Sequence, residues 1–416
     1  MESITSTLKY DQYSDSGYEW IGEIPEHWDL VKLGSCLSPV SVKNCPELPL
    51  LSITREQGVI ERDVDNQESN HNFIPDDLSG YKKLEKGQFG MNKMKAWQGS
   101  YGVSKFTGIV SPAYFIFDFT KAINPEFFNW AIRSKLYVSF FGSASDGVRI
   151  GQWDLSKARM KVIPFVLPSE EEQSLIANFL DKKTALIDEA ISIKEQQISL
   201  LKERKQIIIQ QAVTQGLDPN VPMKDSGVDW IGKVPAHWEV KKMKTFARIK
   251  NGIDYKHVES DSGYSVYGSG GQFTFANRFL YKGEAVLLGR KGTIDKPLYV
   301  NEAFWTVDTM FYAVCNTRVV TKYLYFCATT IPFGFYSTAT ALPSMTQTDL
   351  LNHKFAVPSF SEQLDIIAFI EDKEFEIEEC IKLQRQQISK LKEYKTTLIN
   401  SAVTGKIKIT PEMVEQ

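Results

Sequence analysis

The chain has 416 residues, of which 43% are hydrophobic and 24% charged, and its formal net charge is −3. This length predicts two or three domains. The composition is globular, and no membrane-length apolar run or N-terminal leader is visible, so we expect a cytoplasmic protein that does not enter a membrane. The five cysteines form no C-x-x-C pair, and with the five histidines they lie at no zinc-ligand spacing. They predict reduced, mostly buried thiols and no metal site.

A phrase near the N-terminus occurs twice in the chain. Residues 15–28 read DSGYEWIGEIPEHW, and residues 225–238 read DSGVDWIGKVPAHW. Over the longer windows 15–33 and 225–243, ten of nineteen positions are identical. A repeat of this kind predicts a duplicated unit. We expect its tryptophans and prolines to pack where the chain leaves one helix and enters the next domain.

A variable stretch follows each phrase and predicts a mixed α/β module rich in strands. Aromatic and β-branched residues bounded by turn residues favour strands. The expected strands are 113–119, 285–289, 297–300 and 309–314, and the expected short helices are 125–136 and 321–330.

Three short segments resemble catalytic motifs without completing one. Asn124-Pro125-Glu126-Phe127 is similar to the Asn-Pro-Pro-Phe of adenine methyltransferases but lacks the second proline, and a proline at a helix start explains it better. GSGG at 268–271 and GRKGT at 289–293 lack the residues or spacing of a phosphate-binding loop. His27 and His237, beside tryptophans in the repeated phrase, are interpreted as packed structural residues. We therefore predict no active site.

Each variable stretch ends in a predicted long helix. Ser169 with Glu172, and Ser359 with Glu362, fit the S-x-x-E pattern that caps a helix start. Gly216 and Gly405 allow the left-handed conformation that ends a helix. A continuous helix from Ser169 to Gly216, or from Ser359 to Gly405, would extend roughly 70 Å at about 1.5 Å per residue.

The apolar positions of both helices alternate by three and four, which is typical of a coiled coil. Polar residues interrupt the pattern at Lys194, Lys205, Gln384 and Lys395, so each helix alone would be poorly stabilised. We expect the two to pack on each other in antiparallel fashion. The predicted seam is Ile187, Ile191, Ile198, Leu201 and Ile208 in the first helix, and Ile377, Ile381, Ile388, Leu391 and Leu398 in the second.

Positive charge is concentrated in one segment of each variable stretch. Residues 81–108 carry six lysines against one glutamate, and residues 278–296 carry five basic residues against two acidic ones. Both segments mix cations, glycines and hydroxyls next to predicted strands, a composition that suits contacts to phosphate oxygens. A solvated surface loop is the alternative, but the paired occurrence favours nucleic acid.

As a set, the repeated phrase, the helices with their Glu-Gln start, GSYGVSK, GRKGT and YGSGG resemble the DNA specificity subunit of type I restriction-modification enzymes, over essentially the whole chain. The resemblance implies an α+β protein. Two mixed α/β target-recognition domains are joined by two long helices that form an antiparallel coiled coil, in a pseudo-two-fold circular arrangement. The corresponding segments are residues 1–167 and 217–357 for the recognition domains, 168–216 and 358–405 for the spacer helices, and 406–416 for the tail.

The resemblance also implies the function and the partners. Each recognition domain would read one half of a bipartite, asymmetric site in double-stranded DNA, and the coiled coil would fix the gap between the half-sites. Two modification subunits, adenine methyltransferases that use S-adenosylmethionine, would dock on this chain, and a restriction subunit with motor and nuclease activity would join them. The chain itself would catalyse nothing and hold no cofactor, and its role would be phage defence.

Composition and resemblance together nominate the residues that contact DNA. Lysines are expected on phosphates, whereas Gln98 and Arg290 are expected to reach base edges. The nominated residues are Lys93, Lys95, Gln98, Ser100, Tyr101, Ser104, Lys105 and Arg149 in the first domain, and Ser269, Arg290, Lys291, Thr293, Lys296 and Ser344 in the second.

Two alternatives stay open at this point. One is a recognition chain of a restriction-modification enzyme of another type, in which nuclease and methylase share a polypeptide. The other is a coiled-coil adaptor that binds only protein and competes for modification subunits. Neither predicts the two basic segments as well.

Overall fold

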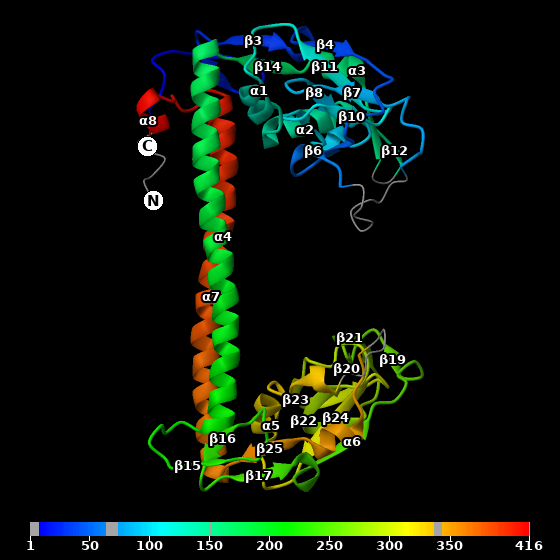
Figure 1. The fold of residues 1–416 in the computed structure, drawn as a ribbon, viewed down its shortest axis with the longest axis vertical. Coiled ribbons are helices and arrows are strands. Elements are labelled where there is room, and N and C mark those ends of the chain that lie inside the picture. The colour runs from blue at the N-terminus through cyan, green and yellow to red at the C-terminus, as the bar shows by residue number, and fades with distance from the viewer. Residues whose placement is uncertain (1–7, 64–73, 150–151, 337–342, 416) are drawn as a thin grey trace. The chain divides into compact units, whose positions relative to one another are not determined.

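A computed structural model describes residues 8–63, 74–149, 152–336 and 343–415, except for the side chains of Val148, Arg149 and Gln152. The chain divides into two compact units. Unit 1 comprises residues 1–193 and 386–416, and unit 2 comprises residues 194–385. Each unit contains a recognition domain together with parts of the two long helices, α4 (Glu170–Gln215) and α7 (Phe360–Val403) (Figure 1).

The remaining elements of unit 1 are short. Its strands are β1 (Tyr13–Asp15), β2 (Glu23–Pro25), β3 (Asp29–Lys32), β4 (Leu37–Val40), β5 (Leu51–Thr54), β6 (Gly58–Glu61), β7 (Lys82–Leu84), β8 (Phe89–Met91), β9 (Tyr101–Val103), β10 (Gly108–Val110), β11 (Phe115–Phe119), β12 (Ser145–Arg149), β13 (Gln152–Leu155) and β14 (Pro164–Leu167). Its other helices are α1 (Pro125–Ile132), α2 (Lys135–Ser143), α3 (Lys157–Lys161) and α8 (Pro411–Glu415).

Unit 2 has longer strands. They are β15 (Met223–Asp225), β16 (Lys233–Pro235), β17 (Glu239–Lys242), β18 (Ala247–Asn251), β19 (Glu259–Ser260), β20 (Tyr264–Gly268), β21 (Gly271–Ala276), β22 (Tyr281–Gly289), β23 (Leu298–Thr306), β24 (Met310–Cys315) and β25 (Lys354–Val357). The helices beside α4 and α7 are α5 (Thr321–Ala328) and α6 (Gln347–Asn352).

Both recognition domains are built on the same order of sheet strands. In unit 1 the order is β4-β11-β8-β9, and in unit 2 it is β18-β24-β22-β23, followed by β20, β21 and β19. These pairings are antiparallel except for β20 with β23, which is parallel. Strand β8 therefore corresponds to β22, and β11 corresponds to β24. The predicted α+β duplication is confirmed.

One predicted helix is divided in the structure. The segment 125–136 was expected to be continuous, but α1 ends at Ile132 and α2 begins at Lys135. Ser134 between them has an extended backbone, and its hydroxyl accepts from the Tyr137 amide, which caps α2. Asn124 caps α1 by accepting from the Phe127 amide. That contact supports the helix-start interpretation of the Asn-Pro segment.

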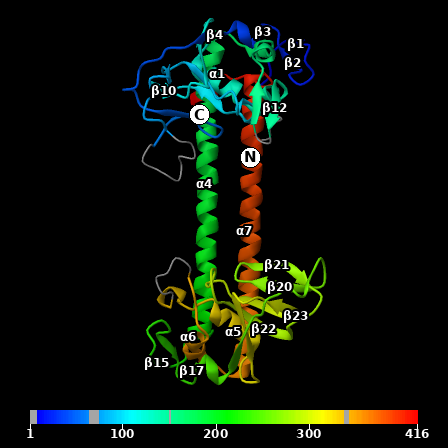
Figure 2. The same ribbon diagram turned by 90° about the vertical axis from the view of Figure 1, so that its right-hand side faces the viewer.

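Helices α4 and α7 run side by side in opposite directions, as predicted (Figure 2). In unit 1, the Lys395 ammonium on α7 lies 2.6 Å from the Asp188 carboxylate on α4. In unit 2, Lys194 donates to the Gln384 amide oxygen at 3.1 Å. The residues that interrupt the apolar pattern thus find polar partners on the other helix.

The seam residues occupy the covered face of these helices. Ile187, Ile191, Ile377, Ile381, Ile388 and Leu398 are all less than 10% exposed. Ile198, Leu201, Ile208 and Leu391 are half-buried. Burial of one apolar stripe on each helix is the main source of stability in a two-helix pair, since helices of this composition gain little from propensity alone.

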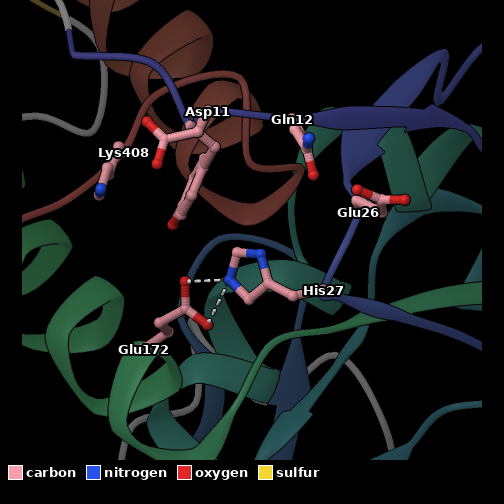
Figure 3. A pocket seen from close by; sticks show the side chains of 7 residues that line it. Asp11, Gln12, Glu26, His27, Glu172 and Lys408 are labelled. Atoms are coloured by element: carbon pink, nitrogen blue, oxygen red, sulfur yellow. Dashed lines mark hydrogen bonds and ion pairs between the residues drawn. The ribbon is translucent and has the colours of Figure 1, made fainter.

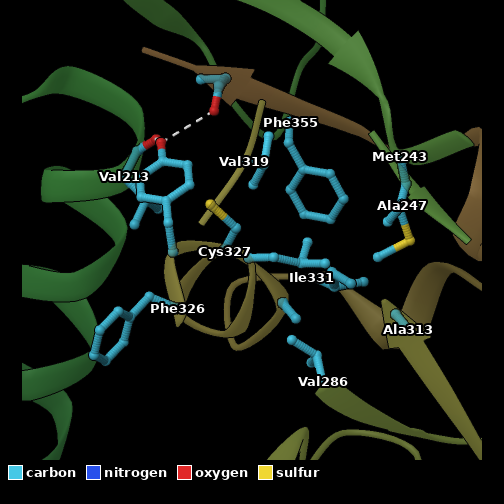
Figure 4. Packing of buried hydrophobic residues seen from close by; sticks show 14 of the residues in the cluster. Val213, Met243, Ala247, Val286, Ala313, Val319, Phe326, Cys327, Ile331 and Phe355 are labelled. Atoms are coloured by element: carbon cyan, nitrogen blue, oxygen red, sulfur yellow. Dashed lines mark hydrogen bonds between the residues drawn. The ribbon is translucent and has the colours of Figure 1, made fainter. Parts of the chain in front are cut away.

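The core of unit 2 joins its recognition domain to the long helices. Val213 of α4, Cys327 of α5 and Phe355 of β25 belong to one buried cluster (Figure 4). The buried Tyr323 hydroxyl lies 3.2 Å from the Val213 carbonyl oxygen and 3.0 Å from that of Ala356. Continuous apolar burial and these polar contacts fix the domain on its part of the helix pair.

In unit 1, two separate chain segments form the junction between the end of a long helix and the repeated phrase. In unit 2, one continuous segment forms the corresponding junction. The Lys408 amide donates to the Leu8 carbonyl at 2.8 Å, and the Tyr13 hydroxyl donates to the Gly405 carbonyl at 3.0 Å. In unit 2 the chain passes directly from Gly216 to β15. This correspondence agrees with the predicted circular arrangement.

All five cysteines are free. Cys36 and Cys327 are buried, Cys45 and Cys315 are half-buried, and Cys380 is exposed. Burial raises the pKa of the Cys315 thiol to about 12, which disfavours its reactive thiolate. Within the described segments, no helix has the length and apolar character needed to cross a membrane.

Candidate nucleic-acid interface

Each basic segment of the sequence contains a loop between two sheet strands, and the two loops correspond. One loop follows β8 and leads to β9, and the other follows β22 and leads to β23. Because β8 and β22 hold the same place in their sheets, both loops leave the same end of the same strand of the fold. The two basic segments of the sequence therefore contain structurally equivalent loops.

The loop of unit 1 is held by its own backbone and by an aromatic stack. The Asn92 amide donates to the Ser100 carbonyl at 3.0 Å, and Gly99 takes the left-handed conformation with φ 89°. The Trp97 ring stacks on Trp153 of β13 with centroids 5.1 Å apart. Lys95 is exposed and Gln98 is half-buried, so both present polar groups on an ordered loop.

Lys93 and Lys105, the other nominated lysines, differ in their surroundings. The Lys93 ammonium lies 3.1 Å from the Asp154 carboxylate, and its side chain is 33% exposed. Lys105 is exposed beyond β9. Arg149 ends β12, and its side chain lies outside the described residues. Lys105 is therefore more exposed than Lys93.

Three nominated side chains of unit 1 are buried inside the domain. Ser100 and Ser104 are each 2% exposed and Tyr101 is fully buried. The Ser104 hydroxyl is engaged with the Phe106 backbone, to whose carbonyl oxygen it donates at 2.7 Å. Burial disfavours direct contact with DNA, because each side chain would first have to leave its packed site. The local GSYGVSK pattern did not reveal this, since β9 packs against other elements.

Nominated residues of unit 2 converge on one turn. Lys291 forms a β-bridge with Ser344, and the Met345 amide donates to the Arg290 carbonyl at 2.9 Å. A Cβ built on Gly292 would lie 3.1 Å from the Ser269 hydroxyl. Ser269, Arg290, Lys291 and Ser344 therefore lie together, although 75 residues of sequence separate the first from the last.

The remaining nominated residues of unit 2 belong to the same loop. Thr293 is half-buried and Lys296 is exposed. The Thr293 carbonyl oxygen would lie 2.3 Å from a Cβ on Gly289, so this turn requires glycine. Replacing Gly289 would open the turn and displace the Arg290 backbone.

Each sheet places cations over an aromatic ring at the loop. In unit 1, the Lys157 ammonium lies 4.2 Å and that of Lys93 6.0 Å from the Phe115 ring centroid. In unit 2, the Arg290 guanidinium lies 5.7 Å from the Phe311 centroid. Phe115 is on β11 and Phe311 on the corresponding β24. Such contacts orient a cation without neutralising its charge.

Arg290 is positioned further by the backbone. Its guanidinium donates to the Asp308 carbonyl at 3.3 Å, and its own amide donates to the Thr309 carbonyl at 2.8 Å. The side chain is half-buried. An arginine restrained in this way loses less conformational freedom when it binds a ligand.

The repeated phrase and the helix start meet at a second, duplicated cluster. The Glu172 carboxylate accepts hydrogen bonds from Trp28 Nε1 and Ser169 Oγ, at 3.0 and 2.8 Å. It also lies 3.0 Å from His27 Nε2 (Figure 3). These contacts outweigh the effect of burial and lower the pKa of Glu172. Tyr10 also lines this hollow, and its pKa is raised by burial and by the charge of Glu172.

Unit 2 repeats this cluster around Glu362. His237 Nε2 lies 2.7 Å from the carboxylate, and Trp238 Nε1 donates to it at 3.1 Å. Although partial burial alone would raise the pKa of Glu362, hydrogen bonds from His237, Ser359 and Trp238 lower it to about 2. His27 and His237 each contact a carboxylate, but their side chains are 55% and 52% exposed, so they are less buried than the packed residues that the sequence predicts.

The glutamine after each of these glutamates ties the helix to the recognition domain. Buried Gln173 accepts from the Asn124 amide at 2.8 Å and donates to the Pro168 carbonyl at 2.9 Å. Gln363 accepts from the Val320 amide at 2.8 Å in the same manner. The Glu-Gln pair therefore fixes both the phrase and the domain relative to the helix start. Sequence repetition marked these residues, but it did not indicate their partners.

Among the described residues, no group of three or more His, Cys, Asp or Glu side chains could hold a metal ion. The hollow beside His27 is lined by Tyr10, Asp11, Gln12, Glu26, Glu172 and Lys408 (Figure 3). It lies at the junction between the repeated phrase and the long helix, and its polar contacts hold these two segments together.

Comparison with known proteins connects the fold to one family. Residues 235–393 match the model of the type I restriction modification DNA specificity domain. The type I restriction enzyme MjaVIII specificity subunit of Methanocaldococcus jannaschii is 25% identical over 243 residues, which are 57% of this chain. The chain spans about half the length of that curated relative (53%).

Two solved structures share the fold over most of the chain. One comes from a study of complex assembly and conformational transition of the type I R-M system, with a TM-score of 0.72, 14% identity and coverage of 92% of this chain and 99% of the other. The second is the HsdS subunit of Thermoanaerobacter tengcongensis, with a TM-score of 0.56, 14% identity and coverage of 94% and 100%.

Proposed function

We propose that the chain is the DNA-binding specificity subunit of a type I restriction-modification complex, since its residues 235–393 match the model of the type I restriction modification DNA specificity domain. The observation that carries the proposal is the pair of corresponding basic loops, one after β8 and one after β22. The match to that domain model supports recognition of DNA sequence, and the loops would supply the groups for it.

We propose that the two recognition domains read the two halves of one bipartite, asymmetric target. Their sheets share a strand order, which supports a common way of docking on DNA. Their loops differ in sequence and in the elements around them, which supports readout of different bases. Helices α4 and α7 would set the spacing, since helix length changes in fixed steps of about 1.5 Å per residue.

The contacts are assigned by exposure and chemistry. Lysine side chains would neutralise phosphates, which gives affinity without sequence information. These lysines are the exposed Lys95, Lys105, Lys291 and Lys296 and the half-buried Lys93. Gln98 and Arg290 would reach base edges, because amide and guanidinium groups form paired hydrogen bonds with bases. Ser269, Thr293 and Ser344 would donate hydroxyl hydrogen bonds beside Arg290.

The partners follow from the same assignment. Modification subunits, two per specificity chain, would dock on this chain and supply S-adenosylmethionine-dependent adenine methylation, and a restriction subunit with motor and nuclease activity would join them. The chain itself would catalyse nothing. The similarity to a specificity subunit and to a structure from a type I assembly supports this division of labour.

A methylation map tests the proposal. The chain is co-expressed with the modification subunits of its host, and methylated adenines are mapped across the genome with and without it. One bipartite motif that disappears without the chain is the expected result. Stable assembly with no methylated motif would refute DNA recognition and favour a competing adaptor.

Two substitutions assign the half-sites. Arg290→Ala should relax the motif in one half only, at a discrimination cost of about 1–3 kcal/mol for a base contact. Gln98→Ala should relax the other half. If both variants altered the same half, the assignment of one domain to each half would be wrong. Exposed Glu203→Gln, on α4, is the control and should leave the motif unchanged.

A further inference from the structure

We propose that a second basic cluster in unit 1, formed by Lys43, Lys82 and Lys157, binds backbone phosphates of the DNA beside the loop after β8. This inference rests on the proposed function and extends its contact surface. None of the three lysines belongs to the nominated set, and Lys43 and Lys157 lie outside the basic segments of the sequence.

Three separate elements bring these lysines to the start of β11. Lys82 begins β7, and its ammonium donates to the Tyr114 carbonyl at 2.7 Å. Lys157 begins α3, and its ammonium lies 4.2 Å from the ring centroid of Phe115, the next residue after Tyr114. Lys43 comes beside β7 because the Lys83 amide donates to the Val42 carbonyl at 2.8 Å.

Two neighbouring lysines have a carboxylate partner, whereas no such partner lies among the described residues for these three. Lys83 pairs with Glu85 at 2.6 Å and Lys93 with Asp154 at 3.1 Å. Among the described residues, no carboxylate forms an ion pair with a member of the cluster. The fold therefore gathers three positive charges at one place, where none of them forms an ion pair with a described carboxylate.

Electrostatics disfavours this arrangement in the absence of an anion. Lys82 is half-buried, and its pKa is lowered by this burial and by the positive charges of Lys43 and Lys157. Like charges held together in this way are relieved when an anion arrives. Lys43 and Lys157 are exposed, so an anion from solution can reach the cluster.

The position of the cluster favours DNA phosphates as the anion. Lys157 shares the Phe115 ring with Lys93 of the candidate loop, so the cluster and the loop form one continuous surface. A duplex presents one negative charge per about 1.7 Å of its axis, which suits several adjacent cations. Contacts of this kind fix the register of the protein and carry no base information.

The salt dependence of binding separates this role from sequence readout. Duplexes of roughly 30 base pairs, about three helical turns, would be used with and without the methylated motif. The full chain, assembled with its modification subunits, is compared with a Lys82→Gln, Lys157→Gln double variant. Lys121→Gln is the matched control, because this exposed lysine follows the other end of β11.

The double variant should reduce the slope of log K against log salt by about 0.9 for each lysine. The methylated motif should stay the same, and Lys121→Gln should alter neither quantity. Because Lys157 is exposed, the single Lys157→Gln variant provides the test if loss of Lys82 prevents folding, with about half the effect.

Two outcomes would overturn this inference and leave the proposed function standing. An unchanged slope, with wild-type protein still binding its motif, would mean that the cluster touches no phosphate. A changed motif would mean that it reads bases. If the wild-type complex bound neither duplex, the proposed function would fail and this inference with it.

Discussion

Replacing Glu362 by glutamine should destabilise unit 2 in a pH-dependent manner. The carboxylate receives hydrogen bonds from Trp238 and Ser359 and pairs with His237, and these contacts lower its pKa from 4.5 to about 2. Glutamine has nearly the same shape but carries no charge. The substitution therefore removes the charge-dependent part of the cluster and preserves most of its packing.

The magnitude follows from the shift in pKa. At about 1.36 kcal/mol per pH unit, the difference between 4.5 and about 2 corresponds to roughly 3 kcal/mol. Because 35% of the side chain is exposed, solvent screening reduces the expected effect to about 1–2 kcal/mol. The pKa in the folded protein lies below that of the unfolded chain. The stabilisation is therefore complete above pH 4.5 and is lost as the pH falls toward 2.

Urea unfolding followed by tryptophan fluorescence provides the measurement, since Trp238 of this cluster is one of the eight tryptophans that contribute to the signal. Wild type and Glu362→Gln should differ by about 1–2 kcal/mol near neutral pH, and by less than half of that near about pH 3. Exposed Glu203→Gln is the control and should show no difference at either pH. A penalty of equal size at both pH values would refute the reasoning, because it would show that the carboxylate charge contributes nothing.

The helix pair supports three further predictions. Ile381→Ala truncates a buried seam side chain and should lower the free energy of unfolding in urea by about 2–5 kcal/mol. The exposed Leu383→Ala should change it by less than about 0.5 kcal/mol. Equal losses for the two variants would contradict the assignment of Ile381 to the buried seam. Lys205→Ala removes the 2.9 Å contact with Glu378 and should cost at most about 1 kcal/mol, an effect that should shrink in high salt. Inserting four residues, about one turn, into both α4 and α7 should lengthen the DNA spacer that methylation mapping detects and leave both half-sites unaltered; an altered half-site would exclude the helices as the spacing element.

The repeats and the helices could be predicted because their signals are local. Ser169 and Ser359 mark helix starts with capping residues, and a three-and-four spacing of apolar side chains places one stripe of a helix against a partner. Antiparallel pairing followed from the duplication, since each helix comes after its own domain. The sequence thus determined the α+β class, the order of the elements and the face on which α4 and α7 meet.

The tertiary structure decided which polar groups meet and which are covered. Lys194 and Lys395 appear in the sequence as interruptions of the seam, but their partners Gln384 and Asp188 lie far away along the chain. Tyr101 belongs to a promising basic segment and is nevertheless fully buried. In the same way, Lys43, Lys82 and Lys157 form a cluster although no spacing links them.

The physical reason is the range of the interactions. Capping and periodic burial depend on residues within one or two helical turns, so the sequence contains them directly. Burial of one strand side chain, or the charge around one lysine, depends on every element that packs nearby. Those elements approach one another only when the chain folds, and that approach determines which lysine and arginine side chains stay exposed.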